Sequence, residues 1–528
     1  MRGRLVRVAV AALAVLGLAF AVPTGGPASA LGFDAKLQMI PVEGGVSLEA
    51  LVLRPWGSGP HPLVVFISPW SMDWTENTLP ALTLANKGYT VVSYVTRGFK
   101  NSGGEVGVAS PTDVRDTSTV LDWSLANTAS DATRVGVYGL SYGAGMGILA
   151  AAKDSRIKAV TALSGWYDLP ASFARDDVRS ASAGKLLHDS GRAGGRLSAE
   201  TDLRLRQVID PALSDADYAD LVAWAEIRSP KTYLAELNAN KPAILIEQAW
   251  GETAFPPGPM LDFYNAYRGP KRVEFRPGDH ATPEIPALMG LPTGVLDPVY
   301  RWLDAYVAGT DRSITTEPNL QYTPRPVARG TERYTDTASA FGTPRRYRLT
   351  ENGLTTSTAT GPAWSKSIAT DTDSAVSGGQ AMVTGTLQTF LLEPSPIDVS
   401  ALDRTVAAVW SAEPTWTATT RIRGAATLHL PHTPSAAKGT LVAYLLDVDH
   451  LGKARIIGYA PHAWANAAPG RPRAADFAFQ PTAYDLDPGH RLSVVVDGKD
   501  TIFVDANQPG SGVTLTNDGG AHLDLPVR

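Results

Sequence analysis

A serine in a tight turn is the residue of this sequence best placed for nucleophilic chemistry. Residues Gly139–Gly143 read G-L-S-Y-G and match the pattern G-x-S-x-G. An apolar run, Arg134–Tyr138, precedes the motif, and a run of small residues, Gly143–Lys153, follows it. The two glycines permit a sharp strand-to-helix turn, which raises the serine hydroxyl above the edge of a sheet. The motif predicts that Ser141 is a nucleophile; the alternative is an ordinary helix N-cap.

A serine nucleophile needs a general base, and position along the chain selects one histidine. Of the nine histidines, only His61, His188 and His280 precede residue 310. His61 lies between two prolines ahead of a strand-like run, and His188 lies in a segment with helical character. His280 lies on a loop after the strand-like run Arg272–Phe275. When the nucleophilic serine lies in a strand-to-helix turn of this kind, the expected order along the chain is serine, acid, histidine. We therefore expect His280 to be the base.

The third member of such a site is a carboxylate that orients the imidazole and stabilises its cation. Glu252 is the first carboxylate after the run Ala243–Gln248 and lies on the loop that follows it. This position favours Glu252 as the acid. Three other carboxylates remain alternatives: Asp168, Asp262 and Asp279. Asp168 is considered because some hydrolases take the acid from an earlier strand.

Acyl transfer also needs hydrogen-bond donors for the developing oxyanion. The main-chain N–H of Tyr142 is expected at the start of a helix, where it is free to donate. A second donor is expected after the run Leu63–Ile67, where Trp70 could contribute its main-chain N–H or its indole N–H. Alternatively, the Trp70 ring could only line an acyl pocket, since aromatic side chains commonly line ligand sites.

The elements that must position these residues are short apolar runs that alternate with helix-like segments. The runs predict buried parallel strands at Leu63–Ile67, Thr90–Val95, Arg134–Tyr138, Lys158–Leu163, Ala243–Gln248 and Arg272–Phe275. Between the fourth and fifth runs the strand signals are few, and Ser214 with Asp217 marks a helix start. We expect a catalytic α/β domain over residues 31–320, with a helical lid over about 169–238.

The C-terminal part of the chain has a different pattern. A connector rich in Pro, Thr and Arg, Thr315–Arg346, precedes short alternating runs separated by Gly, Pro and Asp turns. The clearest of these runs are Thr440–Leu446, Arg455–Tyr459 and Leu492–Val496. They predict an all-β sandwich or jelly roll over residues 335–528. Residues 447–452 resemble a calcium loop but lack its later acidic ligand, so we expect a β-turn there.

The N-terminus has the three parts of a secretory signal peptide. Arginines at positions 2, 4 and 7 precede an apolar run up to about Val22, and Ala28-Ser29-Ala30 provides a small-residue exit. We expect cleavage near Ala30 and export without a stable membrane anchor, because the apolar run is short for a bilayer span.

Composition restricts the partners and cofactors. The chain has no cysteine, which excludes disulfides, thiolate metal sites and a cysteine nucleophile. A net charge of −5 gives no reason to expect nucleic acid. We expect no metal and no other cofactor, and the sequence does not indicate an oligomeric state.

These motifs resemble the Xaa-Pro dipeptidyl-peptidase and cocaine-esterase family of serine α/β-hydrolases. The resemblance rests on the Ser-Tyr pair of Gly139–Gly143, the R-G-x-x-x-S-x-G loop within Thr96–Gly104, Asp116 with Trp123, and the C-terminal motifs Leu445–Asp449 and Gly489–Leu492. It implies a helical cap and a C-terminal jelly roll. Two positions depart from the family: Glu252 stands where an aspartate is usual, and Trp70 stands where relatives have an oxyanion tyrosine. Arg97 is expected to tie loops together rather than to touch substrate.

Three functions fit these observations. The first is a secreted acyl hydrolase that cleaves a small ester or amide through an acyl-enzyme. The second is a dipeptidyl-peptidase that releases Xaa-Pro dipeptides, which would need carboxylates for the substrate's amino group; Asp168, Asp176 and Asp177 are candidates. The third adds a carbohydrate- or wall-binding role for the β-domain, for which a purely structural role is the alternative.

Overall fold

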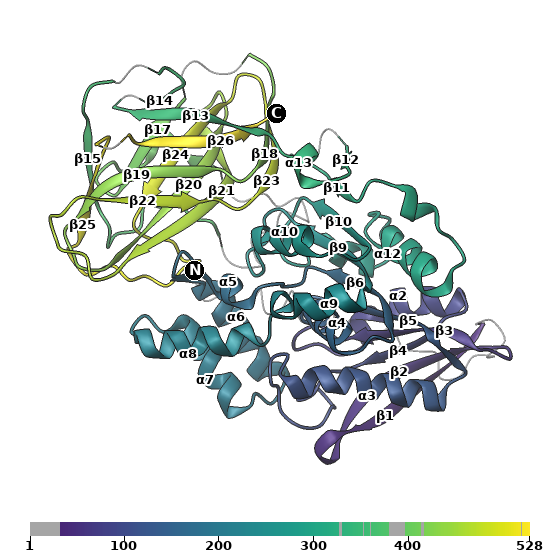
Figure 1. The fold of residues 1–528 in the computed structure, drawn as a ribbon. Helices are drawn as coiled ribbons and strands as arrows, with labels where there is room; N and C mark the ends of the chain where they lie inside the picture. Colours follow the sequence, from purple (N-terminus) through teal and green to yellow (C-terminus); the bar gives the residue numbers. More distant parts are fainter. Residues whose placement is uncertain are drawn as a thin grey trace.

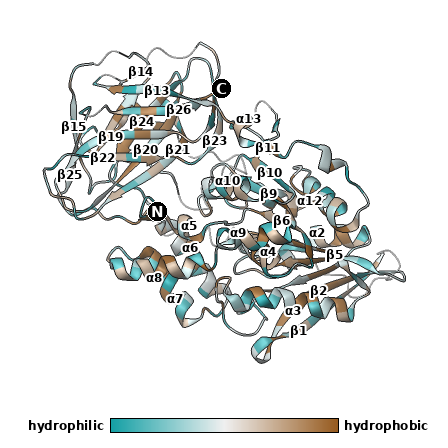
Figure 2. Ribbon diagram, viewed as in Figure 1, coloured by the Kyte–Doolittle hydropathy of each residue, from teal (hydrophilic) through white to brown (hydrophobic). Residues whose placement is uncertain are grey.

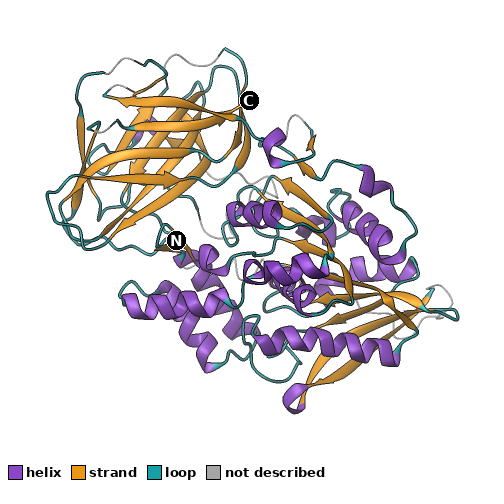
Figure 3. Cartoon of the chain, in the orientation of Figure 1, coloured by secondary structure: helices purple, strands orange, loops and turns teal. Residues whose placement is uncertain are grey.

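The computed structural model describes residues 32–326, 330–351, 353–358, 361–379, 396–412, 417–518 and 520–528. The expected signal peptide, residues 1–30, lies outside the described residues. Figure 1 shows an N-terminal body that contains both helices and strands and a C-terminal body built of strands, and Figure 3 shows the same division by element type. An α/β domain therefore precedes an all-β domain, as the sequence predicts.

The N-terminal domain is organised around one twisted sheet. Its described strands run in the order β1-β2-β4-β3-β5-β6-β9-β10-β11-β12, and every neighbouring pair from β4 to β11 is parallel. All six strands predicted from apolar runs are present, as β3 (His61–Ile67), β4 (Thr90–Tyr94), β5 (Ser130–Leu140), β6 (Ile157–Leu163), β9 (Ala243–Ala249) and β10 (Lys271–Arg276). A hairpin of β1 (Phe33–Val42) and β2 (Val46–Pro55) extends one edge in antiparallel fashion.

Helices cover both faces of this sheet, which explains why its central strands are apolar throughout. One face packs against α3 (Pro111–Asn127), α4 (Tyr142–Lys153), α9 (Leu234–Asn240) and α10 (Pro257–Ala266). The other packs against α2 (Thr78–Asn86), α11 (Glu284–Leu288) and α12 (Leu296–Leu303). Figure 2 shows hydrophobic residues along the central strands and on helix faces turned toward them.

A helical insertion follows β6, where the sequence predicts a lid. It contains α5 (Leu169–Phe173), α6 (Ala181–Gly194), α7 (Ala199–Ile209), α8 (Asp215–Glu226) and a two-stranded hairpin, β7 (Ala174–Arg175) with β8 (Val178–Arg179). Ser214 caps α8, because its side chain accepts the N–H of Asp217 at 3.1 Å. Helix α9 packs against α4 and so belongs to the sheet layer rather than to the lid.

The segment expected to be a connector extends the α/β sheet. Within it, β11 (Leu320–Tyr322) pairs with β10 in parallel, and β12 (Glu332–Tyr334) pairs with β11 in antiparallel. Each of these strands has three residues, which is too few to show an alternation of apolar and polar side chains. The composition, rich in proline and threonine, therefore predicted a connector.

The C-terminal domain consists of two antiparallel sheets that share a buried core of aliphatic and aromatic side chains. The larger contains β13 (Thr343–Thr350), β14 (Gly353–Thr355), β15 (Ser365–Ala369), β18 (Thr420–Gly424), β19 (Thr427–Pro434), β22 (Arg473–Ala478), β23 (Thr482–Leu486), β25 (Gly512–Thr516) and β26 (His522–Val527). The smaller contains β16 (Ile397–Asp398), β17 (Ala407–Ser411), β20 (Gly439–Val448), β21 (Lys453–Trp464) and β24 (Arg491–Asp497). The expected turn at 447–452 is present: Asp449 accepts the N–H of Leu451 at 2.8 Å and of Lys453 at 2.9 Å.

The two domains are joined by hydrogen bonds as well as by the chain. Arg325 reaches into the β-domain, where its guanidinium donates to the carbonyl of Ile457 at 2.5 Å and to the hydroxyl of Thr482 at 2.9 Å. The lid also takes part, since the N–H of Val504 donates to the carbonyl of Arg179 at 2.9 Å. In the part of the chain that the structure describes, no helix is long and apolar enough to cross a membrane.

Candidate active site

Ser141 lies in the turn between β5 and α4, with a backbone φ of +56° that a non-glycine residue rarely adopts. Such a strained conformation is typical of a nucleophile raised above a sheet edge. The flanking glycines are required by space. A Cβ at Gly139 would lie 2.1 Å from the main chain of Gly143, and one at Gly143 would lie 2.2 Å from the carbonyl oxygen of Ile67.

We therefore expect Gly143→Ala to destabilise the protein by about 3 kcal/mol or more, because the new methyl group collides with backbone that cannot move aside. Chemical denaturation would measure the loss. Gly361→Ala is the matched control, since a Cβ there meets only a methyl group of Thr350 at 3.9 Å. Equal stability of the two variants would contradict this account of the turn.

Ser141, His280 and Glu252 form one continuous chain of hydrogen bonds. The hydroxyl of Ser141 lies 2.8 Å from Nε2 of His280, and Nδ1 of His280 lies 2.9 Å from Oε1 of Glu252. His280 and Glu252 are 3% and 2% exposed, so these hydrogen bonds are shielded from water except near the serine. The structure thus brings together the three residues expected to form the triad, although they are far apart in sequence.

Main-chain donors hold the carboxylate of Glu252 in place. Its Oε1 accepts the N–H of Ala254 at 3.0 Å and the N–H of Phe255 at 3.1 Å, in addition to the contact with His280. Compared with the aspartate usual at this position, glutamate has one more methylene group. The loop 252–255 accommodates it by turning back over the Glu252 side chain.

The alternative acids have other partners. Asp168 caps helix α5 by accepting the N–H of Ala171 at 3.2 Å, and it forms an ion pair with Lys231 at 2.5 Å. Asp262 is exposed on α10. Asp279 accepts the hydroxyl and N–H of Thr253 and the N–H of His280 itself. The imidazole is therefore paired with Glu252 and not with Asp168.

The electrostatics of the site favour a protonated imidazole during the reaction. Burial lowers the pKa of His280, but the charge and hydrogen bond of Glu252, together with the charges of Asp279 and Glu284, outweigh it, so that the pKa lies above its usual value. Burial and the charge of Glu252 raise the pKa of Asp279 to about 6. A protonated imidazole at this position would therefore be stabilised by neighbouring carboxylates.

The two expected oxyanion donors differ in availability. Tyr142 is the first residue of α4, and its N–H has no hydrogen-bond partner among the described residues. The indole N–H of Trp70 donates to the carbonyl of Leu187 on the lid helix α6 at 3.1 Å. This corrects the indole alternative, because that donor is already bound to the lid. The role of the main-chain N–H of Trp70 stays a prediction.

A cluster of aromatic side chains lies next to His280. The ring of Trp70 meets those of Phe99 and Tyr142 edge-on, Tyr142 stacks on Trp166, and Trp166 meets Phe255. Phe255 in turn packs edge-on against the His280 ring at 5.0 Å. The rings form one packed aromatic cluster that reaches the triad at the His280 ring. That Trp70 lines an acyl pocket stays a prediction.

The loop that resembles the family's R-G-x-x-x-S-x-G pattern is held by Arg97. Its guanidinium donates to both carboxylate oxygens of Asp116, at 2.8 and 2.7 Å, and to the carbonyl of Glu43 at 3.1 Å. The structural role expected of Arg97 is the one observed.

The carboxylates considered for an amino group are each held by a different partner. Asp176 forms an ion pair with His462 of the β-domain, Asp177 accepts the hydroxyl of Tyr218 at 3.4 Å, and Asp168 is paired as described above. No group of three or more His, Asp or Glu side chains in the described ranges is arranged to hold a metal ion.

Two residues near the triad were missed by sequence reasoning. The hydroxyl of Ser164, which follows β6, donates to Oε1 of Glu284 at 2.8 Å and accepts the N–H of Ala281 at 3.2 Å. Glu284 begins α11 and is 1% exposed. The sequence signal that could have revealed Glu284 is its position, four residues after the expected base His280.

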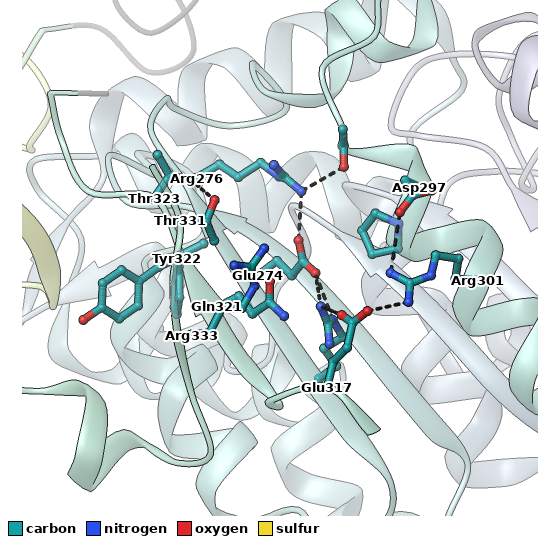
Figure 4. A pocket seen from close by; sticks show the side chains of 14 residues that line it. Glu274, Arg276, Asp297, Arg301, Glu317, Gln321, Tyr322, Thr323, Thr331 and Arg333 are labelled. Atoms are coloured by element: carbon teal, nitrogen blue, oxygen red, sulfur yellow. Dashed lines mark hydrogen bonds and ion pairs between the residues drawn. The ribbon is translucent and has the colours of Figure 1, made fainter. Parts of the chain in front are cut away.

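A separate cleft of about 430 Å³ lies at the edge of the sheet formed by β10 and β11 (Figure 4). Six of its charged side chains are paired with one another: Arg276 with Glu274, Arg272 with Glu274 and Glu317, and Arg301 with Asp297 and Glu317. Because none of the triad residues lines this cleft, it is distinct from the site around Ser141.

Comparison with known proteins places this geometry in a family. Residues 44–282 match the family model described as X-Pro dipeptidyl-peptidase (S15 family), a range that contains Ser141, Glu252 and His280. Residues 317–523 match the model of the X-Pro dipeptidyl-peptidase C-terminal non-catalytic domain. The chain belongs to this family of serine hydrolases. The C-terminal match also accounts for the all-β domain of this S15-family protein.

Curated relatives of the S15-family chain match it over short stretches. It is 32% identical over 108 residues to the cocaine esterase of Rhodococcus sp. (strain MB1 Bresler), which is 20% of this chain and 18% of the esterase. It is 30% identical over 123 residues to an uncharacterized 31.7 kDa protein of Escherichia coli, which is 22% of this chain and 43% of that protein. The matched part thus spans less than half of either relative.

Solved structures extend the likeness of fold over nearly the whole S15-family chain. A CocE/NonD family hydrolase from Staphylococcus aureus is 12% identical with a TM-score of 0.73, over 97% of this chain and 99% of that one. An α-amino acid ester hydrolase is 16% identical with a TM-score of 0.71, over 97% and 100%. An aminopeptidase from a marine sediment Thaumarchaeota archaeon is 14% identical with a TM-score of 0.71, over 96% and 99%. At these identities the agreement concerns the two-domain fold.

Proposed function

We propose that the protein is a secreted serine hydrolase that cleaves acyl ester or amide bonds through an acyl-enzyme on Ser141. The observation that carries this proposal is the unbroken hydrogen-bond chain from Ser141 through His280 to Glu252. In this arrangement the imidazole removes the hydroxyl proton as the serine attacks the carbonyl carbon, and Glu252 stabilises the resulting imidazolium.

The later steps use the same groups. The main-chain N–H groups of Tyr142 and Trp70 donate to the oxyanion of the tetrahedral intermediate. The imidazolium of His280 returns its proton to the leaving group, which departs and leaves the acyl-enzyme. Water, deprotonated by the same imidazole, then attacks the acyl carbon and regenerates the free serine.

The surroundings of the serine favour an apolar acyl group without a free amine. The ring of Phe255 packs against the His280 ring, and the three carboxylates considered for an amino group already have partners of their own. We therefore favour an acyl esterase over a dipeptidyl-peptidase, although the family model carries the latter name.

A substrate panel tests both the activity and the preference. We expect turnover of p-nitrophenyl acyl esters, and rates within about threefold for an Xaa-Pro-anilide and its N-acetylated form, since no amine-binding group would distinguish them. A rate of hydrolysis that is lower for the acetylated anilide by about a hundredfold or more would instead support the dipeptidyl-peptidase. Failure to hydrolyse any ester or anilide would contradict the proposed activity.

Two further parts of the proposal rest on other features. Export is supported by the signal-peptide pattern of residues 1–30. A structural role of the β-domain, in preference to carbohydrate binding, is supported by its hydrogen bonds with the lid and with Arg325.

A further inference from the structure

A buried carboxyl group outside the triad is connected to the turn that carries the base. Oε1 of Glu284 accepts the hydroxyl of Ser164 at 2.8 Å, and that hydroxyl accepts the N–H of Ala281, the residue next to His280, at 3.2 Å. The N–H of Ser164 donates to the carbonyl of Glu247 at 2.9 Å, which orients Ser164 from the sheet side. Glu284 is thus linked to the His280 turn through one hydroxyl.

The backbone on both sides of this link is held in an unusual conformation. Ser164 has a φ of +48° and Ala281 a φ of +58°, values that cost free energy for residues with a side chain. The strain at Ser164 aims its hydroxyl between Ala281 and Glu284. Conformations of this kind persist where the surrounding contacts determine them, and they are concentrated at functional sites.

The second oxygen of Glu284 sets this group apart from an ordinary structural carboxylate. Oε2 is buried and has no hydrogen-bond partner among the described residues. Burial raises the pKa of Glu284 to about 7, with the charge of Glu252 acting in the same direction and the hydrogen bond from Ser164 and the charge of His280 opposing it. Glu284 therefore changes its charge in the pH range in which a serine hydrolase works.

Other charged groups face this pair from every side and must be counted with it. The imidazole of His280 is influenced by Glu252, Asp279 and Glu284, all of which raise its pKa against the effect of burial. Glu284 also interacts with the buried groups Glu247, Arg276 and Tyr138. Arg276 and Glu247 form an ion pair at 2.8 Å, so much of their charge is mutually compensated. Asp279 and Glu284 are then the two carboxyl groups near His280 whose pKa values are raised toward neutrality.

We propose that Glu284 is a positioning residue for His280: it holds the His280–Ala281 turn through Ser164, and it supplies, beside Glu252 and Asp279, a further carboxyl group whose charge acts on the imidazole. This inference rests on the proposed function, because it assigns Glu284 a part in setting the proton affinity of that base. Glu284 does not contact the reacting atoms. Its effect is transmitted through His280.

Two substitutions separate the charge of Glu284 from its mechanical link. In Glu284→Gln the amide oxygen still accepts the hydroxyl of Ser164, but the charge is gone, so the pKa of His280 falls. We expect the acid limb of kcat/KM for a p-nitrophenyl ester to move about half a pH unit toward lower pH. Ser164→Ala breaks the link but keeps the carboxyl group. Because the hydroxyl of Ser164 lowers the pKa of Glu284, part of the charge is lost as well. We therefore expect kcat to fall about tenfold, while the acid limb moves less than in Glu284→Gln.

The comparison includes controls for folding and for charge in general. Glu226→Gln on the exposed side of α8 removes one carboxylate far from the link and should leave the profile unchanged. If Glu284→Gln does not fold, as judged by thermal melting, Glu284→Met removes the same charge with an apolar chain of similar length and is measured in its place.

The outcomes are distinct from those that test the proposed activity. An acid limb that coincides in wild type and in the folded Glu284 variant would overturn the positioning role, while turnover that still depends on Ser141 would leave the proposed hydrolase standing. A limb that moves by the same amount in Ser164→Ala would also overturn it, because the shift would then come from misplacement of the loop rather than from charge.

Discussion

Replacement of Ser141 by alanine should lower kcat/KM for p-nitrophenyl esters by about four orders of magnitude while leaving the fold intact. The hydroxyl oxygen is the atom that would form the acyl-enzyme, and it lies 2.8 Å from Nε2 of His280. The change removes one oxygen atom from a partly exposed side chain, so the sheet and α4 should keep their packing. Initial rates, with thermal melting of both proteins, would measure the effect.

The residual activity of this variant is informative. If the main-chain N–H groups of Tyr142 and Trp70 stabilise the oxyanion, some acceleration over the uncatalysed reaction should persist without the nucleophile, about a thousandfold. Ser155→Ala, an exposed position in the same domain, is the matched control and should retain full activity. Unchanged turnover in Ser141→Ala would remove the basis of the proposed function.

Much of the catalytic arrangement could be predicted because it depends on short-range patterns. The turn at Ser141 needs glycines at fixed offsets, and His280 and Glu252 each lie on the loop that follows a mostly buried parallel strand. Parallel strands place their following loops at one edge of the sheet, so order along the chain translates into proximity in space. The same reasoning predicted the central strands and the helical lid.

What could not be predicted depends on contacts between distant segments. The indole of Trp70 is bound by the carbonyl of Leu187, 117 residues away, and no local pattern reveals which lid turn lies above it. Ser164 and Glu284 are 120 residues apart, and their contact depends on a positive φ at Ser164 that its sequence neighbourhood does not signal. The strands β11 and β12 are too short for periodicity to detect.

The lid and the β-domain both approach the loop that carries the triad carboxylate. The guanidinium of Arg175, in the β7–β8 hairpin of the lid, donates to the carbonyl of Glu252 at 3.5 Å and lies 5.8 Å from the ring centre of Tyr459 in the β-domain. Beside it, Asp176 is paired with His462. The β-domain thus contributes to the position of the lid hairpin above the active site, in keeping with a structural role.

Substitutions at Glu252 should show that both the charge and the side-chain length of this residue are needed for full activity. Glu252→Gln should lower kcat by about three to four orders of magnitude, because an amide cannot stabilise the imidazolium and can present the wrong group to Nδ1 of His280. Glu252→Asp keeps the charge, yet a side chain shorter by one methylene cannot bond both His280 and the N–H groups of Ala254 and Phe255. We expect an intermediate loss, about ten- to a hundredfold.

The matched control for these variants is Asp168→Asn, which removes the alternative acid. Asp168 caps α5 and pairs with Lys231, so its loss should cost about 1 kcal/mol of stability and leave kcat nearly unchanged. The pH profile provides a second criterion: because Glu252 raises the pKa of His280, the residual activity of Glu252→Gln should persist to lower pH than that of wild type. A large loss in Asp168→Asn with full activity in Glu252→Gln would reverse the assignment of the acid, whereas the opposite pattern would establish a glutamate as the third member of the triad.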